Sequence, residues 1–106
     1  MNKKVIVKLH TSFEEMVQHD EASGLEFWLA RDLQMLLGYT KWDNFVNVID
    51  KAVTACANSG HNPNDHFLER RKKVNVGYGT ERIVEDFALT RYACYLIAQN
   101  GDSTKE

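Results

Sequence analysis

The sequence contains no apolar segment long enough to cross a membrane. Its longest uninterrupted apolar run, Tyr92 to Ala98, has seven residues, whereas a membrane-spanning helix needs about 20. The first residues are rich in lysine and no apolar signal stretch follows them, so nothing indicates export. We therefore expect a cytoplasmic protein that does not associate with a membrane.

Cysteine is scarce and is poorly placed for metal binding. The chain has only Cys56 and Cys94, which we interpret as reduced thiols of a cytoplasmic protein. Four residues separate Cys56 from His61, and another four separate His61 from His66. A structural zinc site needs four ligands and usually includes a close pair of cysteines. We therefore predict no bound metal and interpret these histidines as ordinary loop residues.

Sequence motifs of catalysis are also missing. There is no glycine-rich phosphate loop, no nucleophile elbow and no pair of carboxylates at helical spacing that would face a pocket. Glu85 and Asp86 are adjacent, so in a strand they point to opposite faces, where Arg82 or Arg91 could neutralise one of them. Cys94 lies in an apolar run and is interpreted as a buried thiol rather than a nucleophile. We predict no enzyme activity and no cofactor.

Composition predicts one globular domain spanning residues 1–106. The hydrophobic content is 43% and the charged content is 26%, both ordinary for a folded domain of this size. The net charge of −2 creates no overall field that attracts nucleic acid or an anionic membrane. Any basic surface must therefore be local.

The first part of the chain predicts one helix. Thr11 and Glu14 have the spacing of a capping box, which predicts a helix from about Ser12 to His19. Before it, residues 5–9 alternate weakly between apolar and polar types. This stretch is predicted to be a short strand or an ordered arm.

A short strand and two further helices are expected next. Residues 25–29 are predicted to form a strand that leads into a helix over residues 30–37. Thr40 is predicted to cap the longest helix, residues 41–58. Apolar side chains recur along that helix at the three-to-four spacing of a stripe that faces a core.

A β-hairpin is predicted after the long helix. Two extended stretches, residues 67–76 and 82–89, flank a turn that contains Gly77 and Gly79. Such a pattern is typical of a hairpin. A short helix over residues 65–73 remains an alternative.

The apolar run near the end of the sequence predicts a buried helix. Thr90 is a suitable N-cap, and Gly101 suits the left-handed position that follows a helix. A helix that is apolar on all sides needs cover all round. We therefore predict an α+β fold of about four helices with a β-hairpin, packed around a buried C-terminal helix. The expected core residues are Phe27, Leu33, Phe45, Ile49, Tyr92, Leu96 and Ile97.

Two segments are candidates for contact with nucleic acid. The first is the pair of helices joined by the turn at residues 38–40, which resembles a helix-turn-helix. The expected solvent face of its second helix has a net charge of −1, which is unfavourable beside phosphates. Asn44 and Asn47 could read adenine edges, or this face could simply be solvated.

The second segment is the basic hairpin. Four cations follow one another in the sequence, and Arg82 is expected to lie across the hairpin from them. Such a hairpin could hold a phosphate backbone, although solvated edge strands are often rich in Lys and Arg as well. The predicted DNA-binding residues are Arg70, Arg71, Lys72, Lys73 and Arg82, with Lys41 in support.

Three segments resemble a bacterial protein family. They are FWLARDLQMLLGY, AVTACANSGHNPNDHF and EDFALTRYACYLIAQNGD. Together they are similar to bacterial DNA-damage-inducible D proteins, with a likeness that extends from about Phe13 to Asp102. The Leu-Gly-Tyr turn at residues 37–39 is the more general signal of the Bro amino-terminal domain, which occurs in phage antirepressors and viral Bro proteins.

This resemblance implies a regulatory role in the bacterial DNA-damage (SOS) response or in phage-type regulation. It implies DNA binding, no enzyme activity and no cofactor. It also implies that the chain is the amino-terminal domain of a longer protein. The alternative is a protein-interaction module that binds a DNA-repair, recombination or repressor protein.

Overall fold

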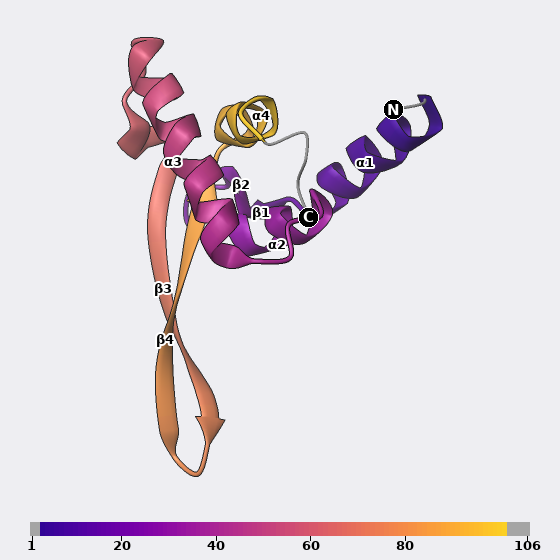
Figure 1. The fold of residues 1–106 in the computed structure, drawn as a ribbon. Helices are drawn as coiled ribbons and strands as arrows, with labels where there is room; N and C mark the ends of the chain where they lie inside the picture. Colours follow the sequence, from indigo (N-terminus) through magenta and orange to yellow (C-terminus); the bar gives the residue numbers. More distant parts are fainter. Residues whose placement is uncertain (1–2, 102–106) are drawn as a thin grey trace.

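A computed structural model of the chain describes residues 3–101, with the side chains of residues 9–71 and 73–101. The elements in chain order are α1 (Lys3–Glu15), β1 (Gln18–His19), β2 (Glu26–Leu29), α2 (Ala30–Leu36), α3 (Trp42–Asn58), the 3-10 turn η1 (Pro63–Asp65), β3 (Phe67–Gly77), β4 (Thr80–Leu89) and α4 (Arg91–Gln99). The predicted α+β fold, with its helices and hairpin, is confirmed (Figure 1).

One antiparallel sheet organises the fold. Its strand order is β1-β2-β4-β3, so the hairpin of β3 and β4 joins the body through the pairing of Trp28 with Leu89. β3 begins at Phe67, directly after η1, which decides between the two alternatives for residues 65–73 in favour of a strand. The far half of the hairpin extends well beyond the helices (Figure 1).

The core lies between one face of the sheet and the helices. Trp28, Leu89 and Phe67 lie opposite one another across the strands and belong to one buried cluster with residues of α2, α3 and α4. The predicted core residues found buried in this cluster are Leu33, Phe45, Ile49, Leu96 and Ile97. Tyr92 is half-buried and packs against the cluster.

The predicted position of Phe27 in the core is wrong. Phe27 is only half-buried, whereas its neighbour Trp28 is completely buried. Successive side chains of a strand point to opposite faces, so only one of the two can face the helices. Trp28 takes that position and donates a hydrogen bond from Nε1 to the carbonyl oxygen of Phe13, 2.7 Å away.

Helix α4 is buried on one side rather than all round. Its N-cap is confirmed, because Thr90 Oγ1 accepts a hydrogen bond from the backbone N–H of Ala93 at 3.1 Å. The buried residues are Ala93, Cys94, Leu96 and Ile97. Tyr95 keeps 47% of its surface exposed and Ala98 is also exposed, so the expected cover on every side is wrong.

Gly101 follows α4, but without the predicted left-handed conformation. It is absent from the glycines of positive φ. A Cβ atom at this position would instead lie 2.9 Å from the hydroxyl oxygen of Tyr39. Close approach to Tyr39 is therefore the physical reason for a glycine here.

Two sequence predictions at helix starts need correction. Residues 5–9 belong to α1 and form neither a strand nor an arm. Their β-branched side chains lower helix propensity only slightly, and extending a helix that already exists avoids the cost of nucleation. Helix α3 begins at Trp42, so Lys41 rather than Thr40 occupies the N-cap position.

No helix within residues 3–101 combines the length and the apolar composition needed to traverse a lipid bilayer.

Candidate nucleic-acid interface

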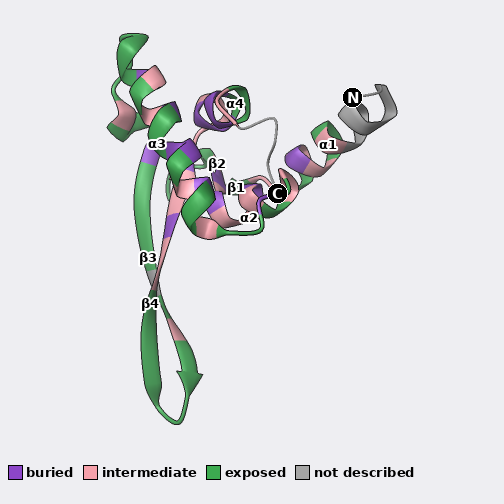
Figure 2. Cartoon of the chain, in the orientation of Figure 1, coloured by how far each residue is buried: buried purple, intermediate pink, exposed green. Residues whose placement is uncertain are grey.

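The hairpin has a stem packed on the body and an arm that leaves it. We define the stem as residues 67–71 with 85–89, and the arm as residues 72–84. The stem contains buried positions such as Phe67 and Leu89, whereas the described residues of the arm are exposed or half-buried (Figure 2). Both faces of the arm are therefore accessible to a ligand.

Charge is strongly segregated along the chain. Residues 70–82 contain five cations and one anion, which gives this segment a net charge of +4. Because the whole chain carries −2, the remaining residues carry −6. Residues 70–82 are thus a locally positive segment that the net charge of the protein conceals, although the whole hairpin, residues 67–89, contains five cations and four anions.

The two stem arginines already have partners on the protein. The guanidinium carbon of Arg70 lies 5.3 Å from the ring centre of Phe27. Arg71 Nε donates to Glu69 Oε1 at 2.9 Å, and both side chains of that pair are mostly exposed. In the strand register Arg70 lies opposite Asp86. Part of the stem's positive charge is therefore offset locally.

The cations of the arm lie on both of its faces. Lys73 is opposite Ile83 and Arg82 is opposite Val74, and residues that lie opposite each other share a face. Lys73 and Arg82 are both exposed, and they point to opposite sides of the ribbon. Lys72 pairs with Val84, while its side chain lies outside the described part. Lys73 and Arg82 thus lie on two faces of the arm and do not form one patch.

Lys41 lies on the body, near the stem of the hairpin. It is exposed and precedes Trp42, the first residue of α3. The ring of Trp42 stacks on Phe87 of β4, with ring centres 6.4 Å apart. The structure therefore places Lys41 near the stem and not on the arm.

The solvent face of α3 matches the sequence prediction. Asn44 and Asn47 are exposed, as are Asp43 and Asp50. Asn44 makes a further interaction within the protein. The acidic residues on this face make α3 a weaker candidate for phosphate contact than the hairpin.

A group of side chains that the sequence did not single out fixes the stem to the body. Arg31 of α2 donates from Nε to the carbonyl oxygen of Glu85 at 2.9 Å. Its guanidinium carbon lies 3.9 Å from the ring centre of Trp42. Asp86 is buried and accepts from the backbone N–H of Arg31 at 3.1 Å. These contacts join the stem to α2 and, through Trp42, to the start of α3.

The tip of the arm has an unusual backbone. Gly77 and Gly79 have φ values of 121° and 78°, and between them Tyr78 has φ 42°. Asn75 Oδ1 accepts a hydrogen bond from the N–H of Gly77 at 3.0 Å, where the strand register shifts. Tyr78 is fully exposed, so the outermost side chain of the arm is an aromatic ring.

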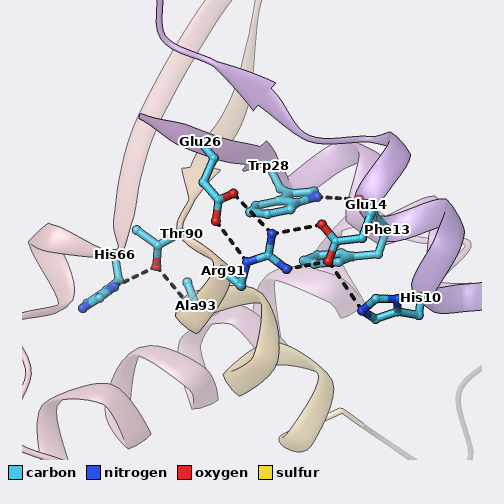
Figure 3. A network of polar contacts seen from close by, with 9 residues as sticks. All are labelled: His10, Phe13, Glu14, Glu26, Trp28, His66, Thr90, Arg91 and Ala93. Atoms are coloured by element: carbon cyan, nitrogen blue, oxygen red, sulfur yellow. Dashed lines mark hydrogen bonds and ion pairs between the residues drawn. The ribbon is translucent and has the colours of Figure 1, made fainter. Parts of the chain in front are cut away.

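At the start of α4, Arg91 binds two carboxylates (Figure 3). Its Nη1 and Nη2 donate to the two oxygens of Glu14, and its Nε and Nη2 donate to those of Glu26. The hydrogen bond from Arg91 lowers the pKa of Glu14, and the two carboxylates raise the pKa of Arg91. The expectation that Arg91 offsets Glu85 or Asp86 is therefore wrong.

The same arginine lies beside an aromatic stack. Phe13 and Trp28 are almost parallel, with ring centres 4.3 Å apart and planes at 4°. The guanidinium carbon of Arg91 lies 4.9 Å from the ring centre of Trp28. Figure 3 shows how these groups hold the end of α1 against α4 and β2. This network is a structural support at the start of α4, and Arg91 comes two residues after the end of β4.

The residues considered for metal binding have other contacts. Cys56 Sγ lies 3.9 Å from the carbonyl oxygen of His61, and His66 Nδ1 lies 2.7 Å from Thr90 Oγ1. The rings of His61 and His66 both contact Tyr92, at 4.9 and 5.0 Å between centres. Among the residues that the structure describes, no three His, Cys, Asp or Glu side chains are grouped to hold a metal ion.

Comparison with known proteins gives two matches. Residues 17–106 match the family model described as the N-terminal domain of the BRO family. The chain is also 46% identical over 96 residues to DNA damage-inducible protein D of Escherichia coli (strain K12). That alignment covers 91% of this chain and 35% of the relative, so the chain spans about a third of the relative's length. No solved structure matches the chain.

Proposed function

Because this chain belongs to the BRO family, whose N-terminal domain matches residues 17–106, we propose that it is a non-enzymatic regulatory domain. We propose that this domain binds DNA in the bacterial DNA-damage response. The name of its Escherichia coli relative, DNA damage-inducible protein D, supports the link to DNA damage. The proposed location is the cytoplasm, where the chromosome is accessible. The proposal concerns this chain, which corresponds to a third of that relative.

The observation that carries DNA binding is the projecting arm with cations on both faces. The major groove of DNA is about 12 Å wide and admits a two-stranded β-ribbon. Phosphates line both walls of the groove, so Lys73 and Arg82 on opposite faces of the ribbon can each meet one strand. Contacts of this kind fix position and supply affinity without reading sequence. Binding by the arm is therefore expected to be weakly dependent on DNA sequence.

The test compares two variants that lose the same charge. The arm variant carries Lys73→Ser and Arg82→Ser, and the control carries Lys51→Asp at an exposed position in the middle of α3, which lowers the net charge by the same two units. Binding to a labelled duplex of about 20 base pairs is measured by fluorescence anisotropy at low salt. The arm variant should bind roughly 10- to 100-fold more weakly than the unaltered chain, because it loses two phosphate contacts. The control should lose no more than about threefold.

The opposite ranking would assign binding to α3 and its asparagines. Equal losses in both variants would show that only total charge matters. If the unaltered chain fails to bind DNA at low salt, the proposal is overturned.

A separate observation favours protein docking as the second function. On the outer face of the sheet, Leu25 and Leu68 are 70% and 61% exposed. They border a cavity of about 330 Å³ that also touches Phe27 and Ala88. Exposed apolar side chains around a hollow are typical of a surface that binds another protein. A DNA-repair, recombination or repressor protein is the expected partner.

A variant of the apolar surface, tested in cells, can distinguish protein docking from DNA binding. The substitutions Leu25→Ser and Leu68→Ser should leave DNA affinity unchanged because both residues lie away from the arm. A loss of the damage response in cells carrying this variant, with DNA binding intact, would place function on the apolar surface. A normal response would remove support for protein docking there.

A further inference from the structure

The tip of the arm combines strain with complete exposure. Among residues 3–101, Tyr78 is the one non-glycine residue with a positive φ. Bulky side chains rarely adopt this conformation, and Gly or Asn would fit the turn with less strain. Tyr78 gains no burial that would offset this strain, because its ring is fully exposed. Folding therefore gives no reason for an aromatic residue at this position, and such outliers point to a function.

The residues behind Tyr78 are suited to a partly apolar, partly anionic ligand. Val76 is 56% exposed and lies between Tyr78 and the pair of Val74 with Arg82. Ile83 is 60% exposed and lies opposite Lys73, one pair nearer the stem. The turn at residues 78–79 separates Tyr78 from β4, and Arg82 lies two residues along β4 from Thr80.

An intact duplex offers nothing for this ring to stack on. The faces of its bases are covered by neighbouring bases, and only their edges and the phosphates are accessible in the grooves. An unpaired base exposes an aromatic face, on which a tyrosine ring stacks favourably with little dependence on base identity. The cations behind the tip can meanwhile contact phosphates of the flanking duplex.

We infer that Tyr78 is a base-stacking residue and that the arm prefers DNA with an unpaired base flanked by duplex. This inference rests on the proposed DNA binding and adds the class of DNA that is recognised. The ligand is a bulge, a gap or a similar interruption, with its phosphates held by Lys73 and Arg82.

The experiment uses two duplexes that differ by one unpaired base. One is continuous and the other contains a single bulged 2-aminopurine, whose fluorescence falls when it stacks. The unaltered chain is compared with Tyr78→Phe, which keeps the ring, and Tyr78→Asn, which removes the ring but suits the left-handed turn. Urea unfolding checks that Tyr78→Asn is at least as stable as the unaltered chain.

The unaltered chain should bind the bulged DNA about 5- to 100-fold more tightly than the continuous duplex and should quench the 2-aminopurine. Tyr78→Phe should keep this preference within about twofold. Tyr78→Asn should lose the preference and the quenching, while its affinity for the continuous duplex stays the same.

Equal affinity of the unaltered chain for both DNAs would overturn the inference, as would a preference that survives in Tyr78→Asn. In either case the proposed function stands if the arm variant Lys73→Ser, Arg82→Ser still binds more weakly. If the unaltered chain binds neither DNA, both proposals are overturned. Tyr78 and Val76 at the tip then become candidate contacts for a protein.

Discussion

The carboxylate of Asp86 accepts a hydrogen bond from the backbone N–H of Arg31, 3.1 Å away. This contact joins β4 to the first turn of α2, a helix whose N-cap residue, Leu29, provides no side-chain hydrogen bond. The carboxylate thus satisfies a helix N–H from another strand and lies at the favourable, positive end of the helix dipole. The same contact consequently stabilises both the stem of the hairpin and the start of α2.

Removing this carboxylate should destabilise the domain. Asp86→Ala leaves the N–H of Arg31 buried without its acceptor, which costs about 1–3 kcal/mol. Glu81→Ala, an exposed acid of the arm, is the control and should change the unfolding free energy by less than about 0.5 kcal/mol. Urea unfolding followed by circular dichroism measures both. Equal stability of the two variants would show that Asp86 does not hold the hairpin.

Acid should weaken the attachment of α1 through Glu14. The hydrogen bond from Arg91 lowers the pKa of Glu14 below its ordinary value of 4.5, so the contact stabilises the fold above that pH. The stabilisation is lost as the pH falls through the lowered pKa and Glu14 becomes protonated. Glu14→Gln should therefore show a shallower fall in stability between about pH 5 and pH 2.

The neighbouring exposed residue supplies the control for this prediction. Glu15→Gln should retain the steep loss of stability in acid because Glu15 has no part in the Arg91 network. Thermal unfolding across that pH range provides the comparison. Identical profiles for Glu14→Gln and the unaltered chain would contradict the role given to Glu14.

Both thiols should be unreactive in the folded protein. Burial raises the pKa of Cys94 to about 12 and also raises that of Cys56. Because the thiolate is the reactive form, a disulfide reagent at pH 8 should modify neither cysteine until the chain unfolds. Denaturant should then release two reactive thiols per chain. Rapid reaction of one thiol without denaturant would show that Cys56 or Cys94 is accessible.

The order and type of most elements could be predicted from the sequence because those signals are local. The hairpin was predictable because two extended stretches flank two glycines, and Thr90 correctly marked the start of α4. The error at Phe27 and Trp28 arose because two adjacent apolar residues do not reveal which one faces the core. A shift of one residue exchanges the two faces of a strand, and the contacts of Trp28 with Phe13 of α1 and Arg91 of α4 decide the matter.

The site was predictable as a basic hairpin but not in its internal arrangement. The run of cations was visible in the sequence, whereas the ring that Arg70 contacts belongs to Phe27, which is distant in sequence. The contact between Arg31 and the stem spans more than fifty residues. Such pairings depend on tertiary structure, which no local spacing records.

The salt dependence of duplex binding tests the central claim most directly. Three to five phosphate contacts from the hairpin predict that a plot of log affinity against log salt concentration has a slope of about −2.7 to −4.5. The arm variant Lys73→Ser, Arg82→Ser should flatten that slope by about 1.8, since each contact contributes about 0.9. The α3 control Lys51→Asp should leave it nearly unchanged. An unaltered slope in the arm variant, or a slope flattened only in the α3 control, would contradict DNA binding by the arm.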